Sequence, residues 1–290
     1  MGKILAVVNQ KGGVGKTTTA VNLGAYLAAA GKRVLLVDLD PQANATSGLG
    51  LNPDKLEAGI YEALIGTESI FQIIKRSKQD NFLVAPATVS LAGAGVELVS
   101  LENREFRLQA ILNSVRLEYD YIIIDGPPSL GLLTINSLVA ADEILIPIQS
   151  EYYALEGLGQ LLQTINLIQE NLKPELKIMG VVVTMFDRRN KLSGLVLEDL
   201  KKNFPGRVFE TIIPRSVRLA EAPSFGRSIL QYEPRGRGGV DHSHCAISQG
   251  RPRCSCYLDR RGAAGAMVNL VGCRGSGGCC RGTPFAAGHG

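Results

Sequence analysis

The chain has 290 residues, with 31 Lys and Arg against 27 Asp and Glu, which gives a formal net charge of +4. This length is enough for one large α/β domain with a well-buried core. Because the sequence contains no run of 18 apolar residues and begins without a signal-peptide pattern, we expect a cytoplasmic protein rather than a membrane-spanning or secreted one.

Charge is distributed unevenly along the chain. Residues 1–235 hold 24 basic and 25 acidic side chains, whereas residues 236–290 hold 7 Arg, 2 Asp, all six Cys and all three His. Within the first part, residues 186–235 carry 10 basic and 6 acidic side chains, against 14 and 19 in residues 1–185. A basic segment on an acidic body suggests an anionic partner such as DNA or membrane lipid. A solvated helix face is the alternative interpretation.

Apolar runs alternate with helical segments along the chain, which is the pattern of a parallel sheet covered by helices. We therefore expect an α/β fold with a mostly parallel, twisted sheet and helices on both faces. The expected strands cover residues 3–9, 33–38, 81–85, 120–124, 143–148, 177–184 and 208–213. The expected helices cover residues 17–30, 58–65, 104–117, 131–140, 154–171 and 193–203.

A glycine-rich turn separates the first expected strand from the first expected helix. Residues 10–18 read Gln-Lys-Gly-Gly-Val-Gly-Lys-Thr-Thr. In a phosphate-binding loop, the backbone amides and the helix N-terminus bind phosphate, the lysine reaches the β- and γ-phosphates, and the hydroxyl ligates Mg²⁺. The candidate nucleotide-binding residues are Lys11, Gly12, Gly13, Val14, Gly15, Lys16, Thr17 and Thr18.

This loop departs from the strict G-x-x-x-x-G-K-[ST] pattern at one position. Gln10 stands where the pattern has its first glycine, and a second lysine, Lys11, follows it. The result is the deviant Walker A form, K-G-G-x-G-K-T. A dinucleotide-binding G-x-G-x-x-G fingerprint does not fit, because its third glycine would fall on Thr18.

Acidic turns follow two of the buried strands. Asp38 and Asp40 come after the second strand, and Asp125 ends the four-residue apolar run at 121–124. In an open α/β sheet the ligand lies at the carboxyl ends of the strands, so these carboxylates point to the rim that carries the phosphate loop. Asp125 is typical of a Walker B aspartate, which holds Mg²⁺ directly or through water. Asp38 and Asp40 are candidates for water activation or Mg²⁺ organisation; a helix N-cap is the alternative for any one of them.

Six blocks of sequence together resemble the ParA/Soj chromosome- and plasmid-partitioning ATPases, within the deviant Walker A group that includes MinD. The resemblance spans about residues 1–235. The matching blocks are residues 9–19, 34–42, 44–50, 121–130, 151–157 and 214–226.

The resemblance implies a role for individual residues. Lys11 would reach across an ATP-dependent homodimer to the partner's phosphates, and together with Lys16 and Asp40 it would form the catalytic set. Asp40 would position the attacking water, and Thr17, Asp125 and Asp40 would serve Mg²⁺. Pro214 and Ser216 would contact the adenine, although the family usually has Asn at the position of Ser216.

The resemblance also implies partners. The family binds double-stranded DNA without sequence preference, and Arg189 and Arg218 match its DNA-contacting arginines, with Arg188 and Arg215 nearby. We therefore expect a nucleoid-associated ATPase that uses ATP and Mg²⁺, hydrolyses ATP slowly, is stimulated by a ParB-like centromere-binding protein, and moves a chromosome or plasmid. A surface ion pair is the alternative role for any single arginine.

Other functions have weaker support. A MinD-like ATPase that cycles on the membrane and positions cell division would need a C-terminal basic amphipathic helix. The tail shows no such pattern, so no stable membrane association is expected. An iron–sulfur protein like the nitrogenase iron protein would need cysteines, which residues 1–235 lack. A small-molecule kinase or ligase stays open.

Residues 236–290 form a tail rich in Gly, Arg and Cys, without sustained periodicity. The cysteine pairs at 254 and 256 and at 279 and 280 lack the C-x₂-C spacing of a structural zinc site. The family would continue into a final helix here. We expect the ATPase domain to cover residues 1–235 and the tail to be disordered or a non-native end, such as the product of a shifted reading frame.

Overall fold

The computed structural model describes residues 1–151 and 154–233. They form an eight-stranded sheet in the order β3-β4-β2-β5-β1-β6-β7-β8, in which every neighbouring pair is parallel except β3 and β4. The predicted α/β class with a mostly parallel sheet is therefore confirmed. The predicted tail, residues 236–290, lies outside the described residues.

The seven predicted strands are all present, with ends within two residues of those expected. The strands are β1 (Lys3–Val7), β2 (Val34–Asp38), β3 (Lys75–Arg76), β4 (Phe82–Ala85), β5 (Tyr121–Asp125), β6 (Glu143–Gln149), β7 (Lys177–Phe186) and β8 (Val208–Pro214). The sequence did not predict β3, because it is a two-residue antiparallel edge strand of charged residues and has no apolar run.

The six predicted helices are also present, and five short ones accompany them. The helices are α1 (Lys16–Ala29), α2 (Asn44–Gly48), α3 (Ile60–Ile65), α4 (Ile70–Ile73), α5 (Ala94–Glu97), α6 (Arg107–Val115), α7 (Leu132–Ala140), α8 (Ala154–Asn171), α9 (Lys191–Asn203), α10 (Val217–Glu221) and α11 (Ile229–Tyr232). The unpredicted helices α2, α4, α5, α10 and α11 have four or five residues each, which is too short for a helical period to show in the sequence.

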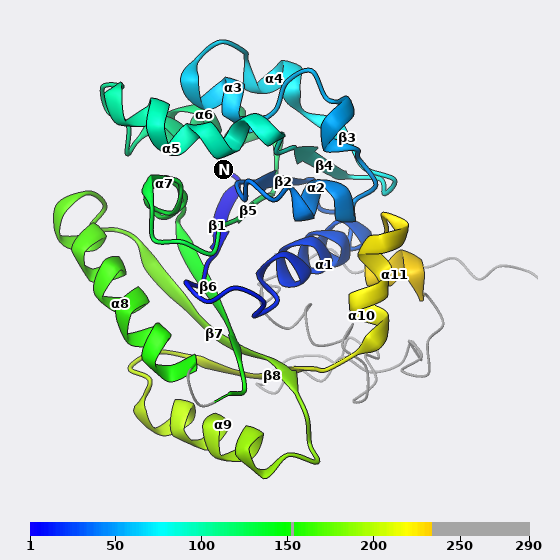
Figure 1. The fold of residues 1–290 in the computed structure, drawn as a ribbon, viewed down its shortest axis with the longest axis vertical. Helices are drawn as coiled ribbons and strands as arrows, with labels where there is room; N and C mark the ends of the chain where they lie inside the picture. The colour runs from blue at the N-terminus through cyan, green and yellow to red at the C-terminus, as the bar shows by residue number, and fades with distance from the viewer. Residues whose placement is uncertain (152–153, 234–290) are drawn as a thin grey trace, which may run out of the picture.

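Helices cover both faces of the sheet (Figure 1). Successive residues of β1 alternate between two apolar cores, with Ile4 and Ala6 in one and Leu5 and Val7 in the other. The first core includes residues of α3 to α9, and the second includes residues of α1, α2, α10 and α11. The central strands are buried on both sides, which explains their uninterrupted apolar sequences.

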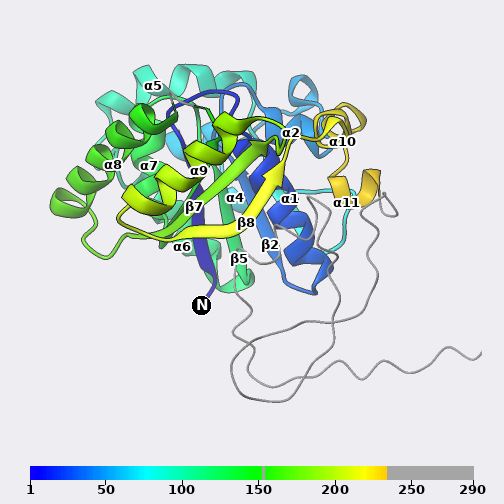
Figure 2. The same cartoon turned by 90° about the horizontal axis from the view of Figure 1, so that it is seen from below.

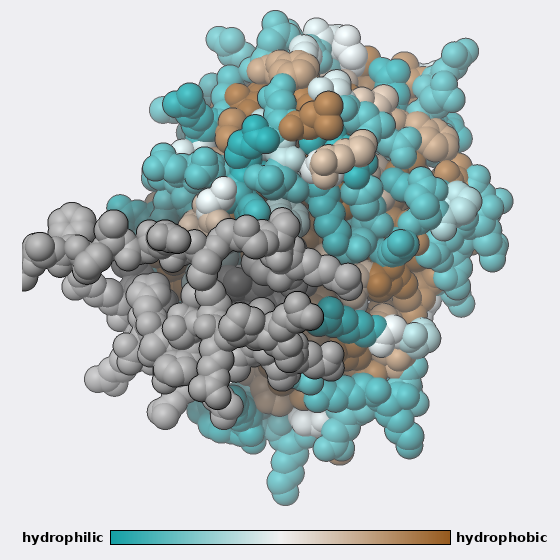
Figure 3. All heavy atoms as spheres, turned by 180° about the vertical axis from the view of Figure 1, so that it is seen from behind, coloured by the Kyte–Doolittle hydropathy of each residue, from teal (hydrophilic) through white to brown (hydrophobic). Residues whose placement is uncertain are grey.

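Parallel pairing brings the ends of the strands together at one edge. Val7 of β1 lies beside Asp125 of β5, and Asp125 lies beside Asp38 of β2. Figure 2 shows the parallel strands running in one direction from the N-terminus. The phosphate loop after β1 and the acidic turns after β2 and β5 therefore meet at the same rim. The surface seen in Figure 3 is mainly hydrophilic, with separate apolar areas.

Candidate nucleotide site

The phosphate loop ends in a helix whose first amides have no side-chain cap. Gly13 and Gly15 have φ of 73° and 84°, a left-handed conformation that glycine adopts without strain. Gly15 is the N-cap of α1 and has no side chain to accept a hydrogen bond from the first turn. The first turn of α1 also contains no acidic side chain. These amides and the helix dipole are thus available to an anion.

Lys16 extends from the first turn of α1 back over the loop. Its Nζ donates a hydrogen bond to the carbonyl oxygen of Lys11 at 3.2 Å, and the side chain is buried. Burial lowers the pKa of Lys16, while the nearby carboxylates of Asp125 and Asp40 oppose that shift. A desolvated ammonium group beside the loop amides fits the phosphate-binding role predicted for it.

Asp125 differs from the other described carboxylates at the rim in its lack of well-formed hydrogen bonds. It is fully buried, and neither carboxylate oxygen has a hydrogen-bond partner of good geometry among the described residues. Burial raises the pKa of Asp125 well above its usual value, and the neighbouring Asp38 raises it further. The Thr17 hydroxyl offsets part of this shift. A buried carboxylate without partners is costly unless a cation neutralises it.

These residues fit Mg²⁺. The ion prefers oxygen ligands and keeps several waters, so one carboxylate and one hydroxyl are enough on the protein side. Asp125 and Thr17 would hold it, and Asp40 lies near enough to affect the pKa of Asp125. Within residues 1–151 and 154–233, no cluster of three or more His, Cys, Asp or Glu side chains forms a metal site of its own.

The two aspartates after β2 have different surroundings. Asp40 lines the cavity described below, and its Oδ1 accepts a hydrogen bond from the backbone N–H of Gln42 at 3.0 Å. Asp38 is fully buried and accepts hydrogen bonds from the backbone and side chain of Thr46. Burial raises the pKa of Asp38 to about 6. The sequence pattern alone could not distinguish these two carboxylates, because both lie at the end of the same strand; only the family resemblance assigned the attacking water to Asp40.

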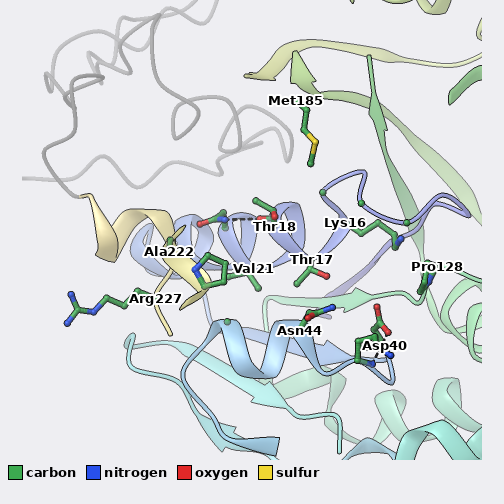
Figure 4. Close-up of a pocket in the computed structure, with 17 residues that line it drawn as sticks. Lys16, Thr17, Thr18, Val21, Asp40, Asn44, Pro128, Met185, Ala222 and Arg227 are labelled. Atoms are coloured by element: carbon green, nitrogen blue, oxygen red, sulfur yellow. Dashed lines mark hydrogen bonds between the residues drawn. The ribbon is translucent and has the colours of Figure 1, made fainter. Parts of the chain in front are cut away.

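A cavity of about 420 Å³ lies in front of the phosphate loop. Figure 4 shows Lys16 and Thr17 on one side and Asp40 and Asn44 on the other. Of the predicted loop residues, Gly12, Gly13, Gly15, Lys16, Thr17 and Thr18 line it. Val14 does not; it is buried, and its carbonyl oxygen accepts a hydrogen bond from Thr184 at 2.8 Å.

A second cavity of about 370 Å³ begins on the other side of the loop helix. Pro214 and Ser216, predicted from the sequence to contact a base, line it together with Gly15 and Thr18 of the loop. Two segments about 200 residues apart in sequence therefore meet at one site. Met185 lines both cavities and has a φ of 51°, which is unusual for a side-chain-bearing residue.

Several residues that line the two cavities were not predicted as site residues, and Met185, Asn44 and Asn22 are three of them. Met185 follows the apolar run of β7, and Asn44 begins the short helix α2. Asn22 lies one turn after Thr18 and donates a hydrogen bond to its carbonyl oxygen at 2.8 Å, drawn in Figure 4. Asn22 is a polar residue on an otherwise apolar helix face, and Asn44 begins one of the blocks that carry the family resemblance, so both had a signal in the sequence; Met185 had none.

Lys11 has an acidic partner in its own chain. Its Nζ lies 2.9 Å from Oε2 of Glu151, at the end of β6. The Lys11 side chain is 35% exposed and that of Glu151 51%, so the pair lies at the surface of the site. The structure thus places Lys11 beside the loop but outside both cavities.

The four predicted arginines are exposed and follow the ends of two adjacent strands. Arg188 and Arg189 come after β7, and Arg215 and Arg218 come after β8. The backbone N–H of Arg215 donates to the carbonyl oxygen of Phe186 at 3.2 Å, which joins the two segments directly. The arginines therefore lie on the same rim as the phosphate loop.

Two of these arginines are paired with carboxylates. Arg189 forms two hydrogen bonds to Asp187, of 3.1 Å from Nε and 2.9 Å from Nη2. Arg218 lies 3.1 Å from Glu221 and 3.8 Å from Glu233. Hydrogen bonds from Arg189 lower the pKa of Asp187 to about 2. Exposed pairs of this kind are weak and exchange easily with other anions.

Comparison with known proteins gives close relatives. A family model described as an AAA domain matches residues 2–178. The sporulation initiation inhibitor protein Soj of Bacillus subtilis is 57% identical over 238 residues, which cover 82% of this chain and 94% of that protein. The chromosome-partitioning ATPase Soj of Treponema pallidum is 49% identical and covers 85% and 96%, respectively. A solved structure of cobyrinic acid a,c-diamide synthase from Mycobacterium smegmatis, with bound ADP and magnesium, has a TM-score of 0.72 at 40% identity and covers 82% and 98%.

The fold and the phosphate loop define a P-loop ATPase that uses ATP and Mg²⁺. The strand order, the deviant loop and the relatives then specify the family. The chain belongs to the ParA/Soj family of chromosome partitioning ATPases, as its sequence predicted. None of the helices in the described part of the chain is long and apolar enough to cross a membrane.

Proposed function

We propose that this partitioning ATPase forms an ATP-dependent homodimer that binds double-stranded DNA without sequence preference. In this proposal a ParB-like partner stimulates hydrolysis and releases the DNA, so that a chromosome or plasmid moves over the nucleoid. The observation that carries it is the placement of Arg188, Arg189, Arg215 and Arg218 on the rim of the nucleotide site. Arginines at this rim can present a phosphate-binding surface whose arrangement depends on the nucleotide.

The proposal assigns a role to each part of the site. Lys16 binds the β- and γ-phosphates, and Thr17 and Asp125 hold Mg²⁺. Asp40 orients the attacking water, and the adenine packs on Pro214 near Ser216. Lys11 leaves Glu151 to reach the partner's phosphates. Lys16, Thr17 and Asp40 line one cavity, and Asp125 lies close enough to Lys16 and Thr17 for each to affect its pKa, which supports the first three roles.

Phosphoryl transfer to water needs positioning and charge neutralisation more than covalent chemistry. The described residues contain no His or Cys, so neither can act as base or nucleophile there. This composition agrees with catalysis by an oriented water and by cations around the phosphates. It gives no support to a thiol- or imidazole-dependent reaction in the same cavity.

DNA binding with ATP, with ADP and without nucleotide tests the proposal. We expect binding of a random-sequence duplex only with ATP. The double substitution Arg189→Ala with Arg218→Ala should weaken it by roughly 10- to 100-fold at every sequence and reduce its salt dependence by about two phosphate contacts. Arg33→Ala with Arg76→Ala removes the same charge from exposed positions elsewhere on the sheet and is the matched control.

Wild-type affinity in the Arg189 and Arg218 double variant, at two salt concentrations, would contradict the assignment of these arginines. Co-sedimentation with anionic liposomes forms the second arm. If the protein pelleted with liposomes in the presence of ATP and did not bind DNA, the result would favour the MinD-like alternative instead. Size-exclusion chromatography with light scattering in each nucleotide tests the homodimer separately.

A further inference from the structure

The segment from Asp38 to Thr46 carries Asp40 to the nucleotide cavity and is anchored at both ends. At its start, Asp38 ends β2 and is fully buried. At its end, Thr46 lies within α2 and is also fully buried. Between them, Asp40 and Asn44 line the cavity, as Figure 4 shows. The position of the Asp40 carboxylate therefore depends on how these ends are held.

Asp38 and Thr46 are joined by two short hydrogen bonds. Oδ2 of Asp38 accepts one from the backbone N–H of Thr46 at 2.8 Å and one from its hydroxyl at 2.7 Å. Oδ1 of Asp38 is 3.3 Å from the backbone nitrogen of Asp40 and accepts from it. All three bonds go to the segment itself. Hydrogen bonds to a buried carboxylate are about twice as strong as neutral ones.

The hydroxyl of Thr46 also forms a hydrogen bond next to a second strand. Its Oγ1 accepts a hydrogen bond from the backbone N–H of Ala87 at 3.0 Å, just after β4. Thr46 thus connects the end of β2 to the end of β4, which neighbours it in the sheet. A single side chain fixes α2 against two strands, because the oxygen of a hydroxyl both donates and accepts hydrogen bonds.

The turn inside the segment is strained. Ala43 has a φ of 50°, in the left-handed region that L-residues with a Cβ disfavour. Its backbone N–H donates to the carbonyl oxygen of Asp40 at 2.9 Å, and the N–H of Gln42 donates to Oδ1 of Asp40 at 3.0 Å. Such strain persists where the surrounding contacts over-determine the backbone. The bonds between Asp38 and Thr46 close this turn on its far side.

The carboxylates of Asp38 and Asp125 differ in the number of hydrogen bonds that they accept. The two carboxylates lie side by side at the ends of β2 and β5. Both oxygens of Asp38 accept hydrogen bonds from the segment, whereas neither oxygen of Asp125 accepts a well-formed hydrogen bond from any described residue. Asp125 is therefore available to a metal ion, and Asp38 is already occupied by the backbone of the Asp40 turn.

We propose that Asp38 and Thr46 are a pair of positioning residues for ATP hydrolysis, which hold the Asp40 turn at the cavity. Neither residue touches Mg²⁺ or the reacting atoms in this proposal. It rests on the proposed role of Asp40 in ATP hydrolysis and is independent of the proposed DNA binding and dimer formation. It replaces the interpretation, open from the sequence, that Asp38 organises the metal.

Two substitutions at Thr46 separate the effect of its hydroxyl group from the effect of its side-chain volume. Thr46→Val keeps the volume and removes the hydroxyl, and Thr46→Ser keeps the hydroxyl. We expect Thr46→Val to lower kcat for ATP hydrolysis roughly 10- to 100-fold, because a small misplacement of a catalytic group has effects of that size. Its equilibrium affinity for ATP should stay within about 2-fold of the wild type. Thr46→Ser should hydrolyse ATP at a rate near that of the wild type.

Asp38→Asn tests the other half of the pair and the competing metal role. We expect a fall in kcat similar to that of Thr46→Val, with the Mg²⁺ concentration for half-maximal activity unchanged within about 2-fold. The double variant should be no slower than the slower single variant, because both changes break the same unit. Multiplicative losses in the double variant would show two independent roles and overturn the proposal.

Other outcomes would also overturn it. Wild-type kcat in Thr46→Val, or in Asp38→Asn at saturating Mg²⁺, would show that the pair does not position the turn. An increase of about 10-fold in the Mg²⁺ requirement of Asp38→Asn would assign Asp38 to the metal. If Thr46→Val does not fold, as judged by thermal unfolding, Thr46→Ser and Asp38→Asn decide the matter through kcat and the Mg²⁺ titration.

Discussion

Several charged side chains around the phosphate loop are buried, whereas those of the arginine rim are exposed to solvent. Lys16, Asp38, Asp40 and Asp125 are buried, and burial shifts the pKa of three of them. Arg189 is 91% exposed, and its ion pair with Asp187 lies in solvent. Buried charges without full compensation are costly, so their presence points to a ligand that completes them. Exposed pairs carry little energy and leave their partners exchangeable.

The largest effect should follow from Lys16→Ala. It removes a buried cation that lies beside the phosphate loop and is influenced by Asp125 and Asp40. We expect ATP affinity to fall at least about 100-fold, measured by equilibrium binding of a fluorescent ATP analogue. Lys32→Ala, at an exposed position after α1, is the control and should bind normally. Tight ATP binding by Lys16→Ala would show that the loop amides alone hold the phosphates.

Asp40→Ala should separate binding from hydrolysis. The side chain lines the cavity opposite Lys16 and Thr17 (Figure 4), so its loss removes a group that orients water. We expect steady-state hydrolysis to fall roughly 100-fold while ATP affinity changes little. Under the proposed function, this variant accumulates as an ATP-bound dimer. Hydrolysis at the wild-type rate would remove Asp40 from the catalytic set.

The pH dependence of stability should report the buried carboxylates. The pKa of Asp38 is raised to about 6, and the pKa of Asp125 is also raised. The folded state therefore binds these protons more tightly than the unfolded state does. Their contribution to the free energy of unfolding is largest below about pH 4 and is lost as the pH rises through the raised pKa values.

Asp125→Asn removes one of these ionisations. Without nucleotide and Mg²⁺, we expect it to melt roughly 2–8 °C above the wild type at pH 7, and to lose less stability between pH 5 and pH 7. Asp187→Asn is the matched control. The pKa of Asp187 is lowered to about 2, so this carboxylate stays ionised throughout the range from pH 5 to pH 7. A wild-type pH profile of melting in Asp125→Asn would mean that Asp125 is neutralised by something other than a bound cation.

The smallest effect should come from Arg189→Ala alone. Its side chain is almost fully exposed, so we expect no measurable change in melting temperature. In the proposed DNA complex it should reduce affinity only about 3- to 10-fold, with a shallower salt dependence. Differential scanning fluorimetry and fluorescence anisotropy at two salt concentrations measure both quantities. A large loss of stability would show that Arg189 contributes to the fold and is not only an exposed surface charge.

The sequence predicted most of the sheet and, at the candidate site, the phosphate loop and the aspartates at the strand ends. Strands buried on both faces, such as β2 and β5, have uninterrupted apolar sequences that identify them. The loop from Lys11 to Thr17 is local, so its glycines and lysines stand together in the chain. Helices such as α2 and α10 were missed because their five residues are stabilised by tertiary contacts and not by a periodic pattern.

What the sequence determined by itself is therefore the local chemistry: the loop, the aspartates that follow strands, and a basic segment after residue 185. Only the tertiary structure decided which of these groups face each other. It brought Pro214 and Gly15 to one cavity, and it placed Oδ2 of Asp38 within hydrogen-bond distance of Thr46, whereas the oxygens of Asp125 accept no well-formed hydrogen bond from the described residues. The physical reason is that a charge takes its role from burial and from neighbours, and parallel strand pairing supplies both from distant parts of the chain.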